Sequence, residues 1–353
     1  MLNKLRAKML SLQFRSIRRA VIILIAKIPK DLERAITFGD ALNHFLMISP
    51  FRPLFKFSIP KNIKVNVHDL TFDSPIISAS FKDDVSSLFQ WQLIGIGGIT
   101  YKTVLKMPSK GNLRPRIQEV SHDGNYAILN SLGLPTKGVK KFLPQINNKK
   151  LTKFNRPIGI SIGGNSFEEY LSVFSEIDHH LNTIDFSQFF YEINISCPNT
   201  VDGKCLSDDL ESLKNLIVKF RDISSRMIVV KVSPDSTNEE VLKVCEILSD
   251  FSKTAINIGN TKYVKASDVG LSSKTFSKEG GGLSGKSLYS NTLRMVKLVA
   301  SNYDLPIIAT GGVSSYDNVK ELLDNGASLT GMATLLVSDP FQIPLINYRL
   351  SND

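Results

Sequence analysis

From residue 70 onward, short apolar runs alternate with longer stretches whose apolar residues recur every three or four positions. The short runs predict strands over residues 75–79, 97–101, 158–162, 190–195, 228–232, 255–258, 306–309 and 328–332. The longer stretches predict helices over 166–182, 208–224, 238–250, 288–302 and 315–325. Eight strands with intervening helices in about 280 residues indicate an α/β fold, a (β/α)8 TIM barrel rather than an open sheet.

The first 60 residues follow a different pattern. Residues 1–30 carry eight Lys or Arg and no acidic residue, interleaved with apolar side chains. The longest apolar run there, residues 20–26, is too short to cross a bilayer, which takes about 20 residues. Residues 31–48 then show helical spacing of apolar groups, and Pro50, Pro53 and Pro60 end that pattern. We therefore predict a small helical extension over residues 1–60 and a barrel domain over residues 61–353.

The basic, amphipathic character of residues 1–30 is typical of a segment that lies on an anionic membrane surface. This predicts peripheral membrane contact, at the cytoplasmic face of the cell membrane. Two alternatives remain open, a disordered basic tail or a signal or transit peptide, with a cytoplasmic or, in a eukaryote, mitochondrial inner-membrane location. The helical extension could form a mouth for a lipophilic molecule or simply cap the barrel.

The composition argues against a nucleic-acid binder, a disulfide-linked protein and a metalloprotein. The net charge of +10 comes largely from residues 1–30, and the remainder carries no basic stripe or reading motif of a nucleic-acid binder. Cys197, Cys205 and Cys245 form no disulfide framework and no CxxC pair, which favours a reducing compartment. The five histidines are scattered, so we predict no metal site.

In a TIM barrel the catalytic groups lie at the carboxyl ends of the strands. The thiol of Cys197 can act as a proton acceptor if it ionises near neutral pH. Lys231 lies inside an apolar run, where an unpaired charge is costly, so we expect its side chain to point into the barrel mouth. Asn side chains offer paired donors and acceptors to a flat polar ring. The candidates in chain order are Ala79, Ser80, Lys102, the loop from Asn130 through Leu132, Gly133 and Leu134, Ser161, Asn194, Cys197, Asn199, Lys231, Asn260 and Thr261.

Two glycine clusters follow predicted strands, Gly280 to Gly285 and Gly311-Gly312. Gly-rich backbone at a helix start offers free N–H groups to a phosphate, and barrels often place such a site after their last strands. We therefore expect a phosphorylated cofactor. The dinucleotide motif is not set in a matching βαβ context, so a built-in NAD site is not expected.

Several motifs in order resemble the dihydroorotate dehydrogenases, FMN-binding barrels of pyrimidine biosynthesis. The motifs are Gly111-Asn112-Leu113-Arg114-Pro115-Arg116, Asn130-Ser131-Leu132-Gly133-Leu134-Pro135, Asn194 to Thr200, Gly281 to Gly285, and Ala309-Thr310-Gly311-Gly312-Val313. The resemblance implies that Cys197 is the catalytic base. It implies orotate contacts at Asn130, Asn194, Asn199, Asn260 and Thr261, and lysines at flavin and substrate, Lys102 and Lys231. It implies FMN contacts at Gly285, Gly311, Gly312, Ala333 and Thr334.

The chain combines features of two branches of that family. Cys at the base position resembles the soluble class 1 enzymes, whereas residues 30–38 resemble the extension of the membrane-bound class 2 enzymes. Ser80 stands where both branches have Gly. We expect a membrane quinone as electron acceptor, with fumarate or another soluble oxidant as the alternative, and NAD⁺ would call for an iron–sulfur partner subunit. A related flavin-dependent pyrimidine reductase is the alternative enzyme, and a homodimer remains an open assembly state.

Overall fold

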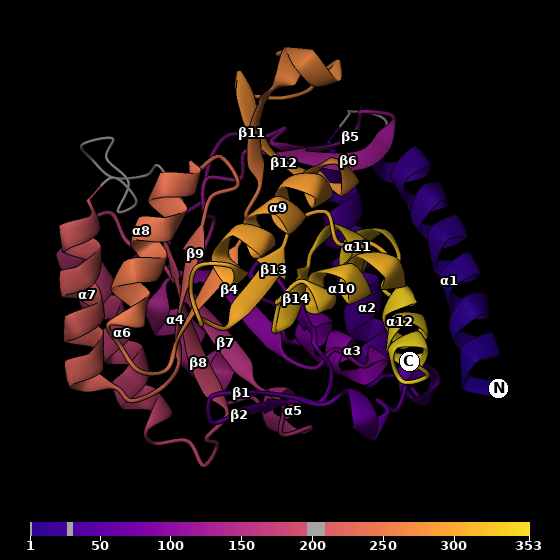
Figure 1. Cartoon of the computed structure of the whole chain (residues 1–353). Coiled ribbons are helices and arrows are strands. Elements are labelled where there is room, and N and C mark those ends of the chain that lie inside the picture. Colours follow the sequence, from indigo (N-terminus) through magenta and orange to yellow (C-terminus); the bar gives the residue numbers. More distant parts are fainter. Residues whose placement is uncertain (1, 27–30, 196–208) are drawn as a thin grey trace.

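The computed structural model describes residues 2–26, 31–195 and 209–353. Eight parallel strands form its centre (Figure 1). Their spatial order is β3, β14, β13, β10, β9, β8, β7, β4. An additional bridge between Ile77 and Gly98 joins the two end strands and closes the ring. The strands are β3 (Ile76–Ser78), β4 (Ile99–Val104), β7 (Ile158–Ile162), β8 (Phe189–Asn194), β9 (Ile228–Val232), β10 (Thr254–Ile258), β13 (Ile307–Thr310) and β14 (Leu329–Met332). All eight predicted strands are present, and the predicted TIM barrel is confirmed.

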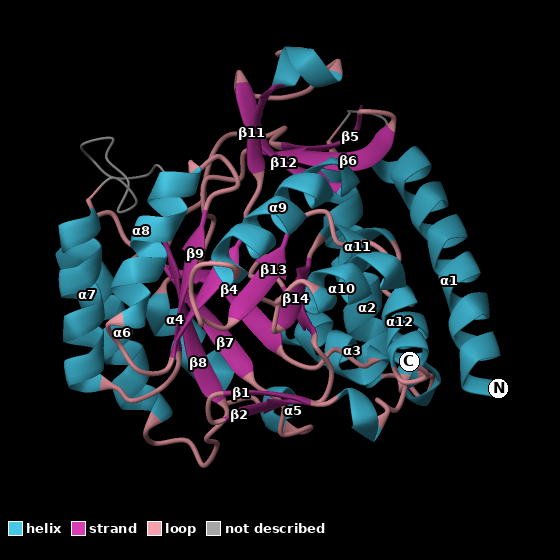
Figure 2. Ribbon diagram, viewed as in Figure 1, coloured by secondary structure: helices cyan, strands magenta, loops and turns pink. Residues whose placement is uncertain are grey.

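Helices surround this barrel on the outside (Figure 2). They are α3 (Val85–Ile94), α4 (Val139–Ile146), α5 (Lys149–Thr152), α6 (Phe167–Leu181), α7 (Leu210–Ile223), α8 (Asn238–Ser249), α9 (Tyr289–Ala300), α10 (Tyr316–Asp324), α11 (Thr334–Ser338) and α12 (Gln342–Leu350). The five helices predicted between strands correspond to α6, α7, α8, α9 and α10. Their starts are set by local chemistry: the side chains of Ser166, Thr237 and Ser315 cap the first turns of α6, α8 and α10.

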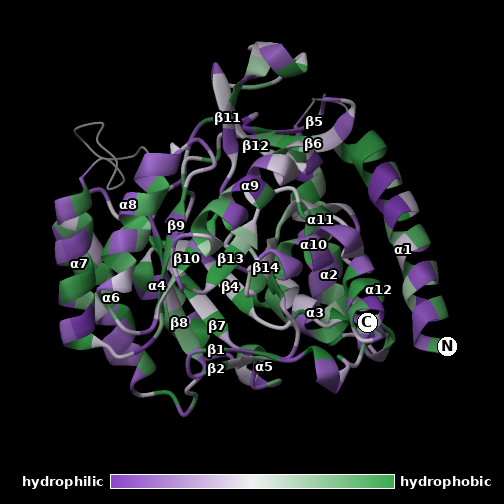
Figure 3. Ribbon diagram, viewed as in Figure 1, coloured by the Kyte–Doolittle hydropathy of each residue, from purple (hydrophilic) through white to green (hydrophobic). Residues whose placement is uncertain are grey.

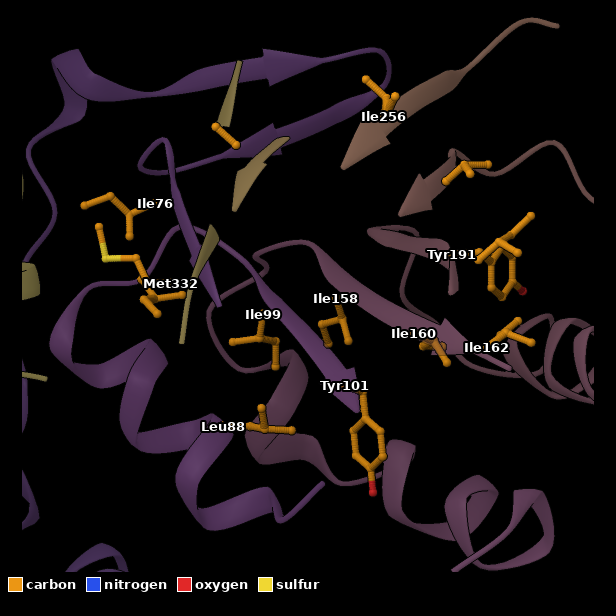
Figure 4. Close-up of a cluster of buried hydrophobic side chains, with 14 of the residues drawn as sticks. Ile76, Leu88, Ile99, Tyr101, Ile158, Ile160, Ile162, Tyr191, Ile256 and Met332 are labelled. Carbon is orange, nitrogen blue, oxygen red and sulfur yellow. The ribbon is translucent and has the colours of Figure 1, made fainter. Parts of the chain in front are cut away.

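Alternation along the strands divides their side chains between two cores. One set faces the helices and forms the main core, which includes Ile99, Ile158, Ile160 and Tyr191 (Figure 4). The other set fills the lower barrel interior, where Ile77, Phe190, Val229, Ala255, Ile308 and Leu329 form a second apolar cluster. A hairpin of β1 (Val65–Val67) and β2 (Leu70–Phe72) contributes Val67, Leu70 and Phe72 to this cluster. Among the described residues, the amino-terminal end of the barrel is therefore filled by apolar side chains.

A four-stranded antiparallel sheet, which we call the upper sheet, lies above the carboxyl-terminal end of the barrel (Figure 1). It consists of β5 (Ile117–His122), β6 (Asn125–Asn130), β11 (Lys262–Lys265) and β12 (Gly280–Gly285), in the order β11, β12, β6, β5. Gly280 to Gly285, expected to be a glycine-rich loop, form the strand β12. Its glycines are required by close packing: a Cβ on Gly282 would lie 2.0 Å from Thr261 Oγ1.

The amino-terminal extension consists of α1 (Leu2–Val21), a π-helical turn (Ile22–Ala26) and α2 (Leu32–Ile48). Helix α1 packs along α12, where Ser11 Oγ donates a 2.6 Å hydrogen bond to the buried Asp339 carboxylate. At the other end of α1, Arg18 donates hydrogen bonds to Glu119 and Tyr126 of the upper sheet. The predicted helix over 31–48 is confirmed as α2. No helix within the described ranges is long and apolar enough to span a membrane.

Helix α1 presents two different faces. Ala7 and Ser11 are buried against the barrel, whereas Leu2, Leu5, Met9 and Leu12 are more than half exposed. At 100° per residue these four side chains lie on the side of the helix opposite Ala7 and Ser11. Figure 3 shows hydrophobic and hydrophilic positions alternating along this helix at the edge of the molecule. We call Leu2, Leu5, Met9 and Leu12 the outer stripe.

Candidate active site

The inward-facing side chains change from apolar to polar toward the carboxyl ends of the strands. On β8 the inward series runs Phe190, Glu192, Asn194, and on β9 it runs Val229, Lys231. Lys231 is level with Asn194 on one neighbouring strand and with Asn257 on the other. Three adjacent strands therefore place a lysine and two carboxamides at one height in the mouth, as expected for Asn194 and Lys231.

Glu192 lies below this level and was not predicted as a site residue. Its side chain is 2% exposed, and Asn257 Nδ2 donates a 2.7 Å hydrogen bond to it. Ser80, which follows β3 across the barrel, donates a 2.5 Å hydrogen bond to Glu192 Oε1 and accepts one of 3.1 Å from Lys231 Nζ. The lysine and glutamate charges are 3.8 Å apart. Ser80 and Lys231 thus belong to one buried polar network.

A second polar group lies on β4 and β7. The hydroxyls of Thr103 and Ser161 are 3.1 Å apart, and Asn194 Nδ2 donates a 3.2 Å hydrogen bond to Thr103. Lys102 lies within an irregularity in the pairing of β4 with β7, between Tyr101 and Val104. Burial lowers the pKa of Lys102, and the nearby Asp83 carboxylate opposes that shift. Ser161 and Asn194 are therefore in contact through Thr103, a residue that the sequence did not single out.

The upper sheet brings in the predicted substrate loop. Asn130 ends β6, and its Nδ2 donates a 3.1 Å hydrogen bond to the Gly282 carbonyl of β12. Asn260 and Thr261 link β10 to β11 of the same sheet, where Thr261 N donates to Asn260 Oδ1. Gly133 adopts a left-handed φ of 67°, and a Cβ there would clash with Asn112 at 2.8 Å. The loop that carries Leu132, Gly133 and Leu134 is thereby held against the Gly111-Asn112 turn.

The last strands supply a glycine-lined rim. Gly311 and Gly312 follow β13 with φ values of 132° and 71°, which favour glycine. A Cβ on Gly312 would lie 2.4 Å from the backbone nitrogen of Tyr289, the first residue of α9. Gly285 ends β12 just before that helix, and Ala333 and Thr334 follow β14, the neighbour of β13. The five residues expected at a phosphate therefore come from adjacent segments.

Cys197 and Asn199 lie outside the described residues, in the segment 196–208. The strand β8 leads directly to them from Asn194. Among the described residues, no group of three His, Cys, Asp or Glu side chains could hold a metal ion.

Buried polar atoms without a protein partner show what kind of ligand the mouth suits. Within the described ranges, Asn257 Oδ1 and Thr310 Oγ1, near the carboxyl ends of β10 and β13, are buried and make no hydrogen bond. An unpaired buried polar group costs about 1–3 kcal/mol, so such atoms suit a ligand that bonds to them. Together with Lys102 and Lys231, they fit an anionic polar ligand. Asn257 was not predicted as a site residue; the signal that could have found it is its polar side chain inside the apolar strand β10, where it lies level with Lys231.

Comparisons with known proteins agree with this geometry. The family model for dihydroorotate dehydrogenase matches residues 62–352. One relative, named dihydroorotate dehydrogenase B (NAD(+)), catalytic subunit, from Malacoplasma penetrans, is 28% identical over 284 residues, which cover 79% of this chain and 88% of the relative. A protein of the same name from Fusobacterium nucleatum is 29% identical and covers 81% of this chain and 91% of the relative.

A solved structure shares the fold. The crystal structure of DHODH in complex with ferulenol, from Eimeria tenella, superposes with a TM-score of 0.70 at 20% identity, covering 89% of this chain and 91% of that one. Since the family model covers most of the chain, the chain belongs to the dihydroorotate dehydrogenase family and is an oxidoreductase that acts on CH–CH bonds.

Proposed function

We propose that this protein oxidises (S)-dihydroorotate to orotate with FMN, as the dehydrogenase step of de novo pyrimidine (UMP) biosynthesis. The observation that carries the proposal is the polar layer at the carboxyl ends of the strands, where Lys231, Asn194 and Asn257 lie at one level above an apolar floor. The unpaired oxygens of Asn257 and Thr310 fit a polar ligand in that layer.

Oxidation of the CH–CH bond removes a proton from one carbon and a hydride from its neighbour. Cys197, as thiolate or hydrogen-bonded thiol, takes the proton from the carbon next to the substrate carbonyl. FMN supplies the hydride acceptor when it is bound. Lys231 and Lys102 stabilise negative charge on the substrate carboxylate or the flavin.

The remaining residues hold the two molecules. Lys102 and the segment that carries Leu132, Gly133 and Leu134 would contact the substrate. Five polar side chains would contact it as well: Asn130, Asn194, Asn199, Asn260 and Thr261. Lys102, Asn194, Lys231, Ala79, Ser80 and Ser161 would hold the flavin part of FMN. Gly285, Gly311, Gly312, Ala333 and Thr334 would hold its phosphate.

For the electron acceptor we propose a membrane quinone, with residues 1–30 in peripheral contact with the membrane. The support is the outer stripe of α1, which leaves four large apolar side chains exposed. Lys4, Lys8, Arg15 and Arg19 are exposed on the same helix, and no acidic residue accompanies them. An apolar stripe flanked by bases suits an anionic membrane surface.

A second candidate acceptor is NAD⁺, reached through a partner subunit. Two relatives are named as NAD(+)-linked catalytic subunits, which favours it. The amino-terminal helices lie outside the family match, which begins at residue 62. The two candidates therefore rest on different parts of the chain and can be separated by experiment.

The test compares dihydroorotate oxidation by the purified full-length protein with a soluble quinone analogue, fumarate and NAD⁺. We expect bound flavin in the visible spectrum and turnover that is fastest with quinone. The double variant Leu5→Glu/Met9→Glu should lose flotation with anionic vesicles, whereas Asn3→Asp, an exposed polar position of α1 away from the outer stripe, should retain it. Turnover with fumarate alone, or only after addition of a partner subunit, would overturn the quinone assignment but not the dehydrogenase.

A further inference from the structure

Glu192 is a buried carboxylate whose partners all lie in the barrel mouth. A charge removed from water is stable only when it is paired and hydrogen-bonded. Glu192 is 2% exposed, and it receives hydrogen bonds from Asn257 Nδ2 at 2.7 Å and from Ser80 Oγ at 2.5 Å. Lys231, 6% exposed, supplies the opposite charge at 3.8 Å. The carboxylate is therefore held in place by three strands or strand ends at once.

Ser80 separates the two charges. Its single hydroxyl hydrogen goes to Glu192, and its oxygen accepts a 3.1 Å hydrogen bond from Lys231 Nζ. A direct ammonium–carboxylate hydrogen bond would be about 2.7–2.9 Å long. The 3.8 Å separation shows that the hydroxyl is inserted between the charges, so that Nζ stays above the carboxylate and nearer the mouth. Glycine at this position would leave the ammonium free to settle on Glu192.

The charge that Lys231 offers to a ligand depends on this arrangement. An ammonium beside a flavin favours the reduced, more negative form, and a carboxylate below the ammonium offsets part of that effect. We propose that Glu192 is a positioning residue which, with Ser80, sets through Lys231 how strongly the barrel mouth favours reduced over oxidised FMN. This inference rests on the proposed function, since it requires FMN beside Lys231.

The two parts of the network have opposite expected effects. Glu192→Gln keeps the shape and one acceptor but removes the negative charge, so the preference for reduced FMN should rise at least about tenfold. A tenfold change corresponds to a rise of about 30 mV in the two-electron midpoint potential. Ser80→Ala removes the separating hydroxyl, so Lys231 should move toward Glu192 and the midpoint potential should fall. If Glu192 and Ser80 only stabilised the fold, their two variants would not shift the midpoint potential in opposite directions.

The measurement is a spectroelectrochemical titration of the FMN-loaded, full-length protein, with the FMN dissociation constant determined in parallel. The matched control is Glu239→Gln, which removes the same charge from an exposed ion pair with Lys243 on α8 and should leave the midpoint potential unchanged. Wild-type protein that binds no FMN would overturn the proposed function. If the wild type and Glu192→Gln both bind FMN and have the same midpoint potential, this inference is overturned but the proposed function is not. If Glu192→Gln does not fold, an unchanged or raised potential in Ser80→Ala overturns it.

Discussion

The two lysines of the barrel mouth have different surroundings. Lys231 donates to Ser80 and is paired with Glu192, so its charge is compensated inside the barrel. Lys102 lies on the opposite side, where burial lowers its pKa despite Asp83. Loss of a proton from Lys102 therefore needs less alkaline conditions than for a solvated lysine. A substrate carboxylate that binds beside Lys102 would restore the charged form, because an opposite charge raises the pKa of an ammonium.

The base assignment predicts a specific pH dependence. A free thiol has a pKa of about 8.5, so the fraction of Cys197 thiolate, and kcat with it, should rise as pH increases toward that value. Cys197→Ser should keep a small part of kcat and shift the profile to higher pH, because a hydroxyl is harder to ionise. Cys197→Ala should lose kcat by about 10²–10⁴-fold. The pH profile of kcat in the three proteins measures this. Full turnover by a Cys197→Ala protein that still binds orotate would contradict it.

At the scale of elements, the first turns of α2 are attached to the barrel mainly by ion pairs, whereas Met47 in its last turn is buried in the main core. Asp31 pairs with Arg114 at 2.6 Å, and Glu33 pairs with both Arg114 and Arg116. Lys82, just after β3, pairs with Asp40 farther along α2. The apolar cluster at the start of α2 is small, with Ala26, Leu32 and Ala35 as its buried members. The ion pairs therefore decide how firmly α2 is held against the upper sheet.

We expect Glu33→Gln to loosen α2 while leaving the barrel intact. Glu33 and Arg116 are both largely buried, and hydrogen bonds between charged groups contribute about 1.5–3 kcal/mol each when they are shielded. The variant should therefore show faster amide hydrogen exchange in α2, with unchanged exchange in β8 and β9. Glu211→Gln, in the first turn of α7, is a matched control with no expected effect on α2. Uniformly faster exchange across the chain would show that Glu33 supports the whole fold instead.

The same elements show what the sequence could predict. The eight barrel strands were predictable because they are buried on both faces and therefore form continuous apolar runs. The strand β12 was not, because Gly-Gly-Gly-Leu-Ser-Gly has no strand preference of its own and pairs only when β6 and β11 are in place. Within the site, the positions of Asn194 and Lys231 were predictable because both residues lie near the carboxyl ends of predicted strands. Glu192 was not, because its burial is explained by Ser80, Lys231 and Asn257, which are distant in sequence.

At the scale of the whole molecule, Cys245 reports on the integrity of the main core. It lies on α8 with no exposed surface, and burial raises the pKa of its thiol to about 12. The thiolate is the reactive form of cysteine, so the native thiol is both shielded and protonated. In the unfolded chain the same thiol ionises near its ordinary value. Between the two values the native state binds one more proton than the unfolded state, so this group's contribution to stability falls as pH rises.

We therefore expect Cys245 to resist alkylation at about pH 8 in the native protein and to react at the rate of a free thiol once denaturant unfolds the barrel. Peptide mass spectrometry distinguishes it from the other two cysteines. Raising the pH toward about 9.5 should lower the midpoint of urea unfolding more in the wild type than in Cys245→Ala, since the variant has no thiol to ionise. Rapid native labelling would mean that α8 opens without unfolding of the barrel it covers. Equal pH dependence in both proteins would contradict a raised pKa of the Cys245 thiol.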